Sequence, residues 1–124
     1  MVVKTKSIYE PVEVIDDGVR LLITRYYPRR IKKDKFDCWV RDLSPSASLL
    51  RNYRLGDYNW EEFKRAFISE MRNNKDSLER IQALNVQNES IVVTLLCYES
   101  QGEHCHRHIV KDAIEKPQLL YAQD

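Results

Sequence analysis

An uninterrupted apolar run near the end of the chain limits the folds that this sequence can adopt. The run from Ile91 to Cys97 reads IVVTLLC, with a single threonine among apolar residues. This pattern is typical of a strand that is buried on both faces, as in parallel sheets covered by helices. Chemically reactive side chains follow within ten positions of the end of the run: Glu99, His104, Cys105, His106 and Arg107. Because ligands of open α/β sheets bind at the carboxyl ends of strands, we expect a site here.

The rest of the sequence predicts a small α/β domain. Further strands are expected over 7–9 and 19–24, and Asp17-Gly18 is a strong signal for a tight turn that would pair 12–15 with the second of them. Apolar periodicity and capping residues predict helices over 34–43, 59–71, 76–85 and 102–115, with N-caps at Asp34, Asn59 and Asp76. These elements indicate an α/β fold with a small, mainly parallel or mixed sheet sandwiched by helices.

Length and composition predict a single globular domain. The chain has 124 residues, 43% of them hydrophobic and 31% charged, as in ordinary soluble proteins. We expect the domain over 1–116 and a C-terminal tail over 117–124. No apolar run approaches the roughly 20 residues that span a membrane, and the first residues lack the features of a secretory signal. Three cysteines, an odd number, indicate reduced thiols and a cytoplasmic protein with no membrane partner.

Positive charge is concentrated in one segment. The net charge is only +1, but residues 20–35 hold seven basic residues and a single acid. A confined basic segment of this kind indicates an anion-binding surface, either for a small anionic ligand or for nucleic acid. A solvated loop explains the same charges without any function.

Helical periodicity sorts the residues that follow the buried strand. The core-facing residues of the last predicted helix are Ile109, Val110, Ala113 and Ile114. His106 shares their direction, and Cys105 lies at the edge of that face, whereas His104 and His108 point to solvent. Cys105 and His106 are therefore expected to face the sheet where Cys97 and Glu99 emerge.

The first turn of a helix suits chemistry with anions. Its free amide groups and the helix dipole attract negative charge and lower the pKa of a thiol. We expect the catalytic residues Cys105, His106 and Glu99 and the ligand-binding residues Arg25, Arg29 and Arg107. The structural alternatives are a hydrogen-bonded core histidine, a small buried thiol and a local ion pair.

Patterns for metals and phosphate loops are weak. The sequence has no CxxC motif, and the donors His104, Cys105, His106 and His108 face opposite sides of one helix, whereas zinc needs converging ligands. A phosphatase loop of the Cys-x5-Arg type fails because Glu103 stands where arginine is required, and three glycines provide no glycine-rich phosphate loop. No metal and no cofactor are expected.

Three segments resemble a known family. They read DDGVRLLITRYYPRRIKKDK over 16–35, LSPSASLLRNY over 43–53 and NWEEFKRAFISEM over 59–71. With Trp39 between them, they resemble the YeaO-like branch of domain-of-unknown-function family 488, and the resemblance runs from Ile8 to Ile114. It implies a compact α/β domain and a bacterial or archaeal intracellular protein, and it carries no established reaction.

The chain departs from the family pattern at two positions. That pattern reads Asp-Arg-Leu-Trp-Pro-Arg-Gly where this chain has residues 24–30; Arg25, Pro28 and Arg29 match, while Thr24 and Arg30 replace the acid and the glycine. The end of the chain, LLCYES followed by HCHR, is similar to the other branch of the family.

Two functions fit these residues, and a third needs no ligand. The first is an anion-binding α/β domain, or a small enzyme, that takes a phosphorylated or nucleotide-like ligand at the strand ends. The second is a nucleic-acid or protein-binding module that uses the basic segment 20–35, with Tyr26 or Tyr27 stacking on bases. The third is an interaction domain in which the polar residues only hold the fold together.

Overall fold

A computed structural model describes residues 2–99 and 104–121 of the chain. Within these residues one sheet has four strands: β1 (Lys4–Ser7), β2 (Val19–Leu22), β3 (Cys38–Trp39) and β4 (Val93–Cys97). The strand order is β1-β4-β2-β3, and every neighbouring pair is parallel. Every residue of β4 is buried at the centre of the sheet, which confirms the interpretation of the apolar run.

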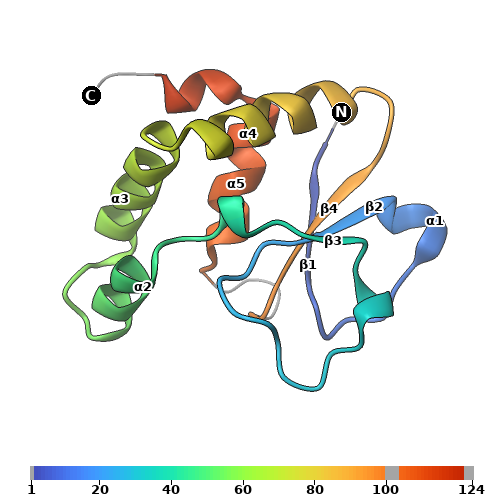
Figure 1. Cartoon of the computed structure of the whole chain (residues 1–124), viewed down its shortest axis with the longest axis horizontal. Coiled ribbons are helices and arrows are strands. Elements are labelled where there is room, and N and C mark those ends of the chain that lie inside the picture. The colour runs from blue at the N-terminus through green and yellow to red at the C-terminus, as the bar shows by residue number, and fades with distance from the viewer. Residues whose placement is uncertain (1, 100–103, 122–124) are drawn as a thin grey trace.

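Helices account for most of the remaining described residues. The α-helices are α1 (Val14–Asp17), α2 (Ala47–Arg54), α3 (Trp60–Arg72), α4 (Lys75–Gln87) and α5 (His106–Glu115), and the 3-10 helices are η1 (Lys33–Lys35), η2 (Arg41–Leu43) and η3 (Pro117–Leu120). Figure 1 shows α3, α4 and α5 on one side of the sheet and α1 on the other. The α/β class and the parallel sheet are confirmed. No helix in the described part of the chain is both long and apolar enough to cross a membrane.

Two apolar clusters lie on opposite faces of the sheet. The large cluster joins the sheet to α2–α5 and includes Phe63 and Phe67 of α3. The small cluster, Ile8, Leu22 and Leu96, is covered by Ile31 and Phe36 from the connection between β2 and β3 and by Trp39 of β3. The long helices therefore cover the face of the sheet that carries the large cluster. A loop and short elements cover the face that carries the small cluster.

The predicted tight turn at Asp17-Gly18 is wrong. Residues Val14–Asp17 form α1, which connects two parallel strands, and β4 lies between those strands. Gly18 has a φ of +60°, and a Cβ atom there would lie 2.2 Å from the carbonyl oxygen of Val92. The glycine is thus needed because the crossover passes close to the backbone just before β4. An Asp-Gly pair in the sequence does not distinguish this use of glycine from a hairpin turn.

The predicted helix over 34–43 is also wrong. This stretch forms η1, the edge strand β3 and η2. Its apolar residues serve two clusters, because Phe36 and Trp39 cover the small cluster while Val40 and Leu43 belong to the large one. A chain that crosses the edge of a sheet in this way can mimic the spacing of an amphipathic helix.

The remaining helices agree with the sequence except at their ends. Asn59 and Glu62 form the predicted capping box of α3. The predicted N-cap at Asp76 is wrong, because the N-cap of α4 is Asn74, whose side chain accepts hydrogen bonds from the amides of Asp76 and Ser77. At its other end, α4 continues to Gln87.

The last part of the chain packs on the domain. The predicted start of the last helix at Gly102 lies outside the described residues; in the described part, α5 begins at His106. Beyond Pro117, Leu120 is fully buried in the large cluster, and its carbonyl oxygen accepts a 2.6 Å hydrogen bond from Nε of Arg72.

Candidate functional site

The carboxyl ends of β2 and β4 lie side by side at one edge of the sheet. The two strands are parallel neighbours, with Leu22 opposite Leu96. Hydrogen bonds join the segments that follow them: the Tyr98 hydroxyl donates to the carbonyl of Tyr26, and Nε2 of His106 lies 2.5 Å from the carbonyl oxygen of Ile23. The sequence-predicted neighbourhood of the two strand ends is therefore present.

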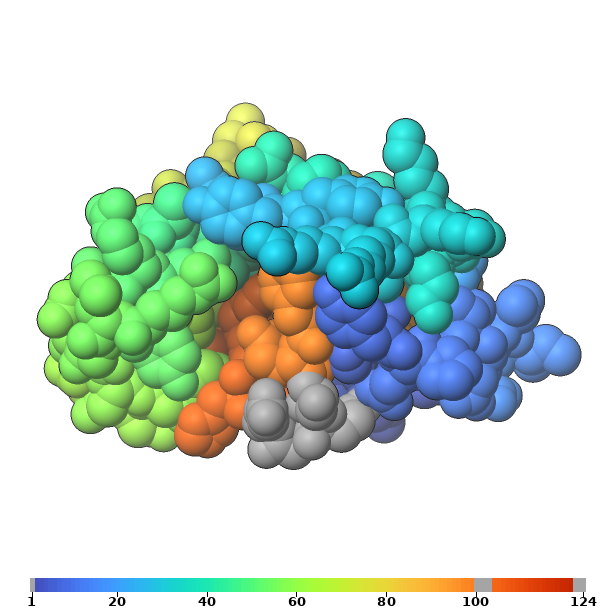
Figure 2. All heavy atoms as spheres, turned by 90° about the horizontal axis from the view of Figure 1, so that it is seen from below, coloured from blue at the N-terminus to red at the C-terminus, as the bar shows by residue number. Residues whose placement is uncertain are grey.

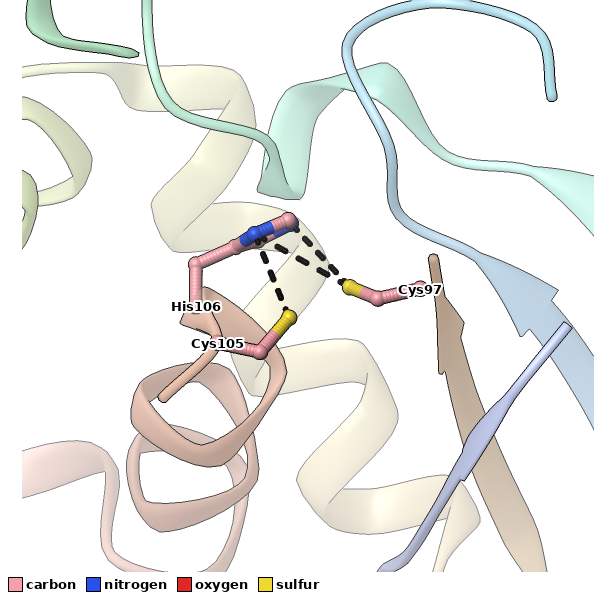
Figure 3. Close-up of side chains that lie close together, drawn as sticks. All are labelled: Cys97, Cys105 and His106. Carbon is pink, nitrogen blue, oxygen red and sulfur yellow. Dashed lines mark hydrogen bonds between the residues drawn. The ribbon is translucent and has the colours of Figure 1, made fainter. Parts of the chain in front are cut away.

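Two thiols and an imidazole converge at this edge (Figure 3). Sγ of Cys97, at the end of β4, lies 3.8 Å from Nδ1 and 3.5 Å from Nε2 of His106, in the first turn of α5. Sγ of Cys105 lies 3.8 Å from the same Nδ1. All three side chains are buried, and one donor atom from each falls within 4.8 Å of the others. This group of three is called the Cys-Cys-His cluster below.

The local sequence explains why the cluster forms. Cys105 is the N-cap of α5, with extended backbone angles, so its thiol lies beside the first turn, near the amide of Arg107. His106 begins the face that continues through the buried residues Ile109, Val110, Ala113 and Ile114. The inward direction that periodicity predicts for His106 is the one observed.

The surroundings shift the pKa values of the Cys97 and Cys105 thiols in opposite directions. A hydrogen bond from Cys97, together with His106 and the amide of Arg107, holds the pKa of the Cys105 thiol far below its ordinary value. Burial, followed by the negative charge of Cys105, raises the pKa of the Cys97 thiol. The pair is thus arranged as a thiolate at Cys105 that accepts a hydrogen bond from a neutral thiol at Cys97.

Glu99 lies beside the thiols. Burial, followed by the negative charge of Cys105, raises the pKa of its carboxyl group. Its Oε2 atom is buried and has no hydrogen-bond partner among the residues that the structure describes. A carboxyl group in this setting holds its proton more firmly than a solvated one and is suited to proton transfer.

A small pocket of about 230 Å³ opens onto the cluster. The described residues that line it are Leu50, Tyr53, Arg54, Trp60, Phe63, Glu99, His104, Cys105 and His106. The ring of exposed His104 stacks on Trp60 at a centroid distance of 4.5 Å. Figure 2 shows the surface hollowed between the green segment of α2 and α3 and the orange segment of β4 and α5. We call this hollow the Cys105 pocket.

The predicted ligand-binding arginines do not line the Cys105 pocket. Arg107 is fully buried, and its Nη1 atom donates a 2.7 Å hydrogen bond to the carbonyl of Glu99. Arg25 lines a separate polar pocket with Ser46 and Glu70, and Arg29 is exposed on the loop after β2. The structure brings Cys105, His106 and Glu99 together with Arg107 beside them in the core, and it leaves Arg25 and Arg29 apart.

Sequence reasoning missed the aromatic wall of the pocket and its cation. Trp60, Tyr53 and Phe63 have the spacing of core residues, and Arg54 is one of many exposed basic residues. Their common pocket arises where α2 and α3 meet the first turn of α5, and no local signal in the sequence reports that meeting.

The Cys-Cys-His cluster also has the composition of a metal site. Its donors come from the strand end and from the helix start, so they converge in spite of the absence of a CxxC motif. The sequence predicts that the donors of this region face opposite sides of the helix. This holds for His104, which is exposed, and His108, which is partly exposed, and neither belongs to the cluster.

Comparisons with known proteins place the chain in a family. A family profile described as the active DUF488-N3 subclade matches residues 3–118. The protein YeaO of Escherichia coli is 28% identical over 83 residues, which cover 65% of this chain and 71% of YeaO. Proteins Rv3073c of Mycobacterium tuberculosis and Mb3100c of Mycobacterium bovis are each 30% identical over 73 residues, 57% of this chain and 61% of their own length. All three carry the description uncharacterized, and no solved structure matches the chain. The match to the profile over nearly the whole length shows that this chain belongs to the DUF488 family.

Proposed function

We propose that the chain is a small enzyme that acts on a nucleotide-like ligand, with a flat ring and an anionic group, in the Cys105 pocket. The observation that carries the proposal is the division of the pocket into two walls. Glu99, Cys105 and His106 lie on one wall, which we call the chemical wall. The rings of Tyr53, Trp60 and Phe63 form the other, aromatic wall, together with Arg54. The description of the subclade as active supports a catalytic role.

The aromatic wall suits a flat ring. Trp60 is already stacked against His104, with ring planes 11° apart, and Tyr53 lies 6.0 Å from Trp60. Aromatic faces bind heterocyclic rings by stacking, with about 1–3 kcal/mol per base in nucleic-acid complexes. A pocket of about 230 Å³ is below the usual range for drug-sized ligands, so the part of the ligand it holds is a single small ring system.

Arg54 is the cation for the anionic group. It is exposed at the mouth of the pocket, on the last turn of α2, and its guanidinium can bind a phosphate or carboxylate through two hydrogen bonds. Arg54 thus takes the role that the sequence led us to expect from Arg107, which binds the backbone of Glu99 instead and positions that carboxyl group.

The chemical wall provides the reacting groups. Glu99 is the proposed proton-transfer residue, and Cys105 and His106 form the inner end of the pocket where the reacting atom of the ligand would lie. Such chemistry needs reduced cysteines, and the three cysteines of the chain are free. The proposal therefore places the protein in the cytoplasm.

A thermal-shift screen with phosphate, nucleosides and nucleotides tests the pocket. A ligand at 100 times its dissociation constant should stabilise the protein by about 2.7 kcal/mol, roughly 10 °C for a chain of this length. Arg54→Ala should abolish most of the shift for anionic ligands. Arg51→Ala, one turn earlier on α2 and exposed, should leave it unchanged. No shift with any of these compounds, or equal loss in both variants, would contradict the proposal.

A second function, nucleic-acid binding, is favoured by one observation. Arg29, Arg30, Lys32 and Lys33 are all exposed on the connection between β2 and β3, and Tyr26 on the same connection is 52% exposed. Tyr27 is less suited to stacking on bases, because its hydroxyl donates to Ile31 and its ring packs against Trp39. Binding of an oligonucleotide through this loop should weaken steeply with salt, and a flat salt dependence would exclude it.

A further inference from the structure

We propose that Cys97, Cys105 and His106 bind one divalent metal ion of the zinc class, with an open coordination position towards the Cys105 pocket. The inference rests on the proposed function, because it assigns the chemical wall of that pocket to a metal centre. The donors are Sγ of Cys97, Sγ of Cys105 and Nδ1 of His106.

The spacing of the donors agrees with tetrahedral coordination. Zinc binds sulfur at about 2.3 Å and imidazole nitrogen at about 2.0–2.1 Å, so tetrahedral angles place sulfur and nitrogen ligands about 3.6 Å apart and two sulfur ligands about 3.8 Å apart. Both thiol sulfurs lie 3.8 Å from Nδ1 of His106, and the three donors fall within 4.8 Å of one another. Sγ of Cys97 also lies 3.5 Å from Nε2, so an ion enters this cluster once the imidazole turns Nδ1 towards the sulfurs and the two sulfurs stand about 3.8 Å apart.

The hydrogen bond on the far side of the imidazole supports the same assignment. A carbonyl oxygen only accepts, so Nε2 of His106 carries the proton that is donated to Ile23, at 2.5 Å. Nδ1 then carries the lone pair that can bind a metal ion, and it lies 3.8 Å from each of the two sulfurs. Metal-bound histidines almost always donate their second nitrogen to a carbonyl or carboxylate group in this way, because that bond fixes the tautomer and the ring orientation.

Charge balance favours an ion in the cluster. Metal binding releases the proton of Cys97, and the two thiolates and one neutral imidazole then carry a charge of −2, which a divalent cation cancels. The three side chains are 0%, 3% and 8% exposed, so an uncompensated charge among them would be costly. A bound cation turns three buried polar groups into one neutral unit.

The open side of the cluster faces the pocket. Cys105 and His106 line the Cys105 pocket, whereas the fully buried Cys97 closes the inner side. A zinc ion with three protein ligands keeps its fourth position for water or substrate, which is the arrangement of catalytic sites and not of closed structural ones. The ion would act as a Lewis acid on the ligand atom that reaches the inner end of the pocket.

Cobalt binding to the full-length chain tests the inference. Reduced protein is freed of metal with a chelator and titrated with Co²⁺, whose absorption reports tetrahedral geometry and sulfur ligands. We expect one equivalent to bind with sulfur-to-metal charge transfer and to raise the melting temperature. Cys105→Ser and His106→Asn should each weaken cobalt binding by at least about 100-fold. Loss of a residue that only hydrogen-bonds to a metal ligand already costs up to about 100-fold in metal affinity, and loss of a ligand itself should cost at least as much.

Matched variants control for folding and for surface binding. Cys38→Ser removes an exposed thiol, and His108→Asn removes a histidine outside the cluster; both should bind cobalt like the unmodified chain. Circular dichroism of each metal-free variant shows whether it is folded. Absence of a tetrahedral cobalt spectrum in the reduced, folded chain would overturn the proposal, and so would equal affinity in Cys105→Ser and Cys38→Ser.

The ligand screen, repeated on the metal-free and the metal-loaded chain, separates the two proposals. Cobalt binding without any ligand shift would leave the metal site standing and refute the proposed function. A ligand shift that Arg54→Ala removes, in a chain that binds no cobalt, would refute the metal site and support the pocket.

Discussion

A buried ion pair next to the start of β2 offers a sharp test of how the sheet is held. The carboxylate of Asp17, at the end of α1, is 1% exposed and accepts hydrogen bonds from Nζ of Lys6 at 3.0 and 3.2 Å, from Nζ of Lys4 at 3.2 Å and from the amide of Glu13 at 2.9 Å. The backbone carbonyl of Asp17 accepts from the Thr94 hydroxyl at 2.7 Å. One residue therefore connects β1, the crossover and β4.

Asp17→Asn keeps the shape of the side chain and removes its charge. Lys6, whose side chain is only 9% exposed, then loses the buried partner of its ammonium group. Removing one member of a buried pair costs about 3–5 kcal/mol. With an unfolding entropy of about 0.26 kcal/mol/K for 124 residues, the melting temperature should fall by about 12–19 °C. Asp16→Asn, at the exposed neighbouring position, should change it little.

The same carboxylate predicts a pH dependence. Burial raises the pKa of the Asp17 carboxyl, but hydrogen bonds from Glu13, Lys6 and Lys4 outweigh burial and leave it below its ordinary value. A lowered folded-state pKa stabilises the protein above the unfolded pKa of about 3.9, and this contribution is lost as the pH falls through the folded pKa. Calorimetry from pH 7 to pH 3 should therefore show the gap between Asp17→Asn and the unmodified chain constant down to about pH 5 and narrower below pH 4. A loss of less than about 1 kcal/mol at pH 7, or a gap that widens in acid, would refute this reasoning.

Two further predictions concern the crossover and the end of the chain. An alanine with positive φ costs roughly 1–2 kcal/mol, and Gly56→Ala, which has open space around its Cβ, should lower the free energy of unfolding in urea by only that amount. Gly18→Ala should lower it by clearly more, because its Cβ would also meet the carbonyl of Val92. Leu120→Ala should cost about 2–5 kcal/mol because the side chain is fully buried, whereas Leu119→Ala, 39% exposed, should cost far less; equal losses would contradict the inclusion of η3 in the core.

The parts of the fold that the sequence predicted are those with a local cause. An unbroken apolar run makes β4 a buried strand whatever surrounds it, and the capping box of Asn59 and Glu62 is complete within four residues. His106 could be oriented because the face of α5 is set by the period of the helix. Each of these inferences needs only neighbours along the chain.

The errors arose where distant segments decide the local structure. Phe36, Trp39 and Val40 have helical spacing, but they are divided between the two faces of the sheet by the pairing of β3 with β2. The Asp17-Gly18 pair matches the signal for a hairpin turn, but β4, whose residues lie far along the chain, decides the local structure at Gly18. Such features depend on strand order, which a single sequence does not contain.

The candidate site combines both situations. Periodicity brought Cys105 and His106 to the end of β4, and that local inference was sufficient to find the chemical wall of the pocket. It was not sufficient to suggest the proposed metal site, because metal motifs are recognised by ligands close together in one loop, whereas Cys97 ends a strand and the other two donors lie at the start of a helix. Parallel β/α connections bring these two kinds of position together at one edge of a sheet. In folds of this class, a cysteine at a strand end should therefore be considered together with the first turn of the next helix.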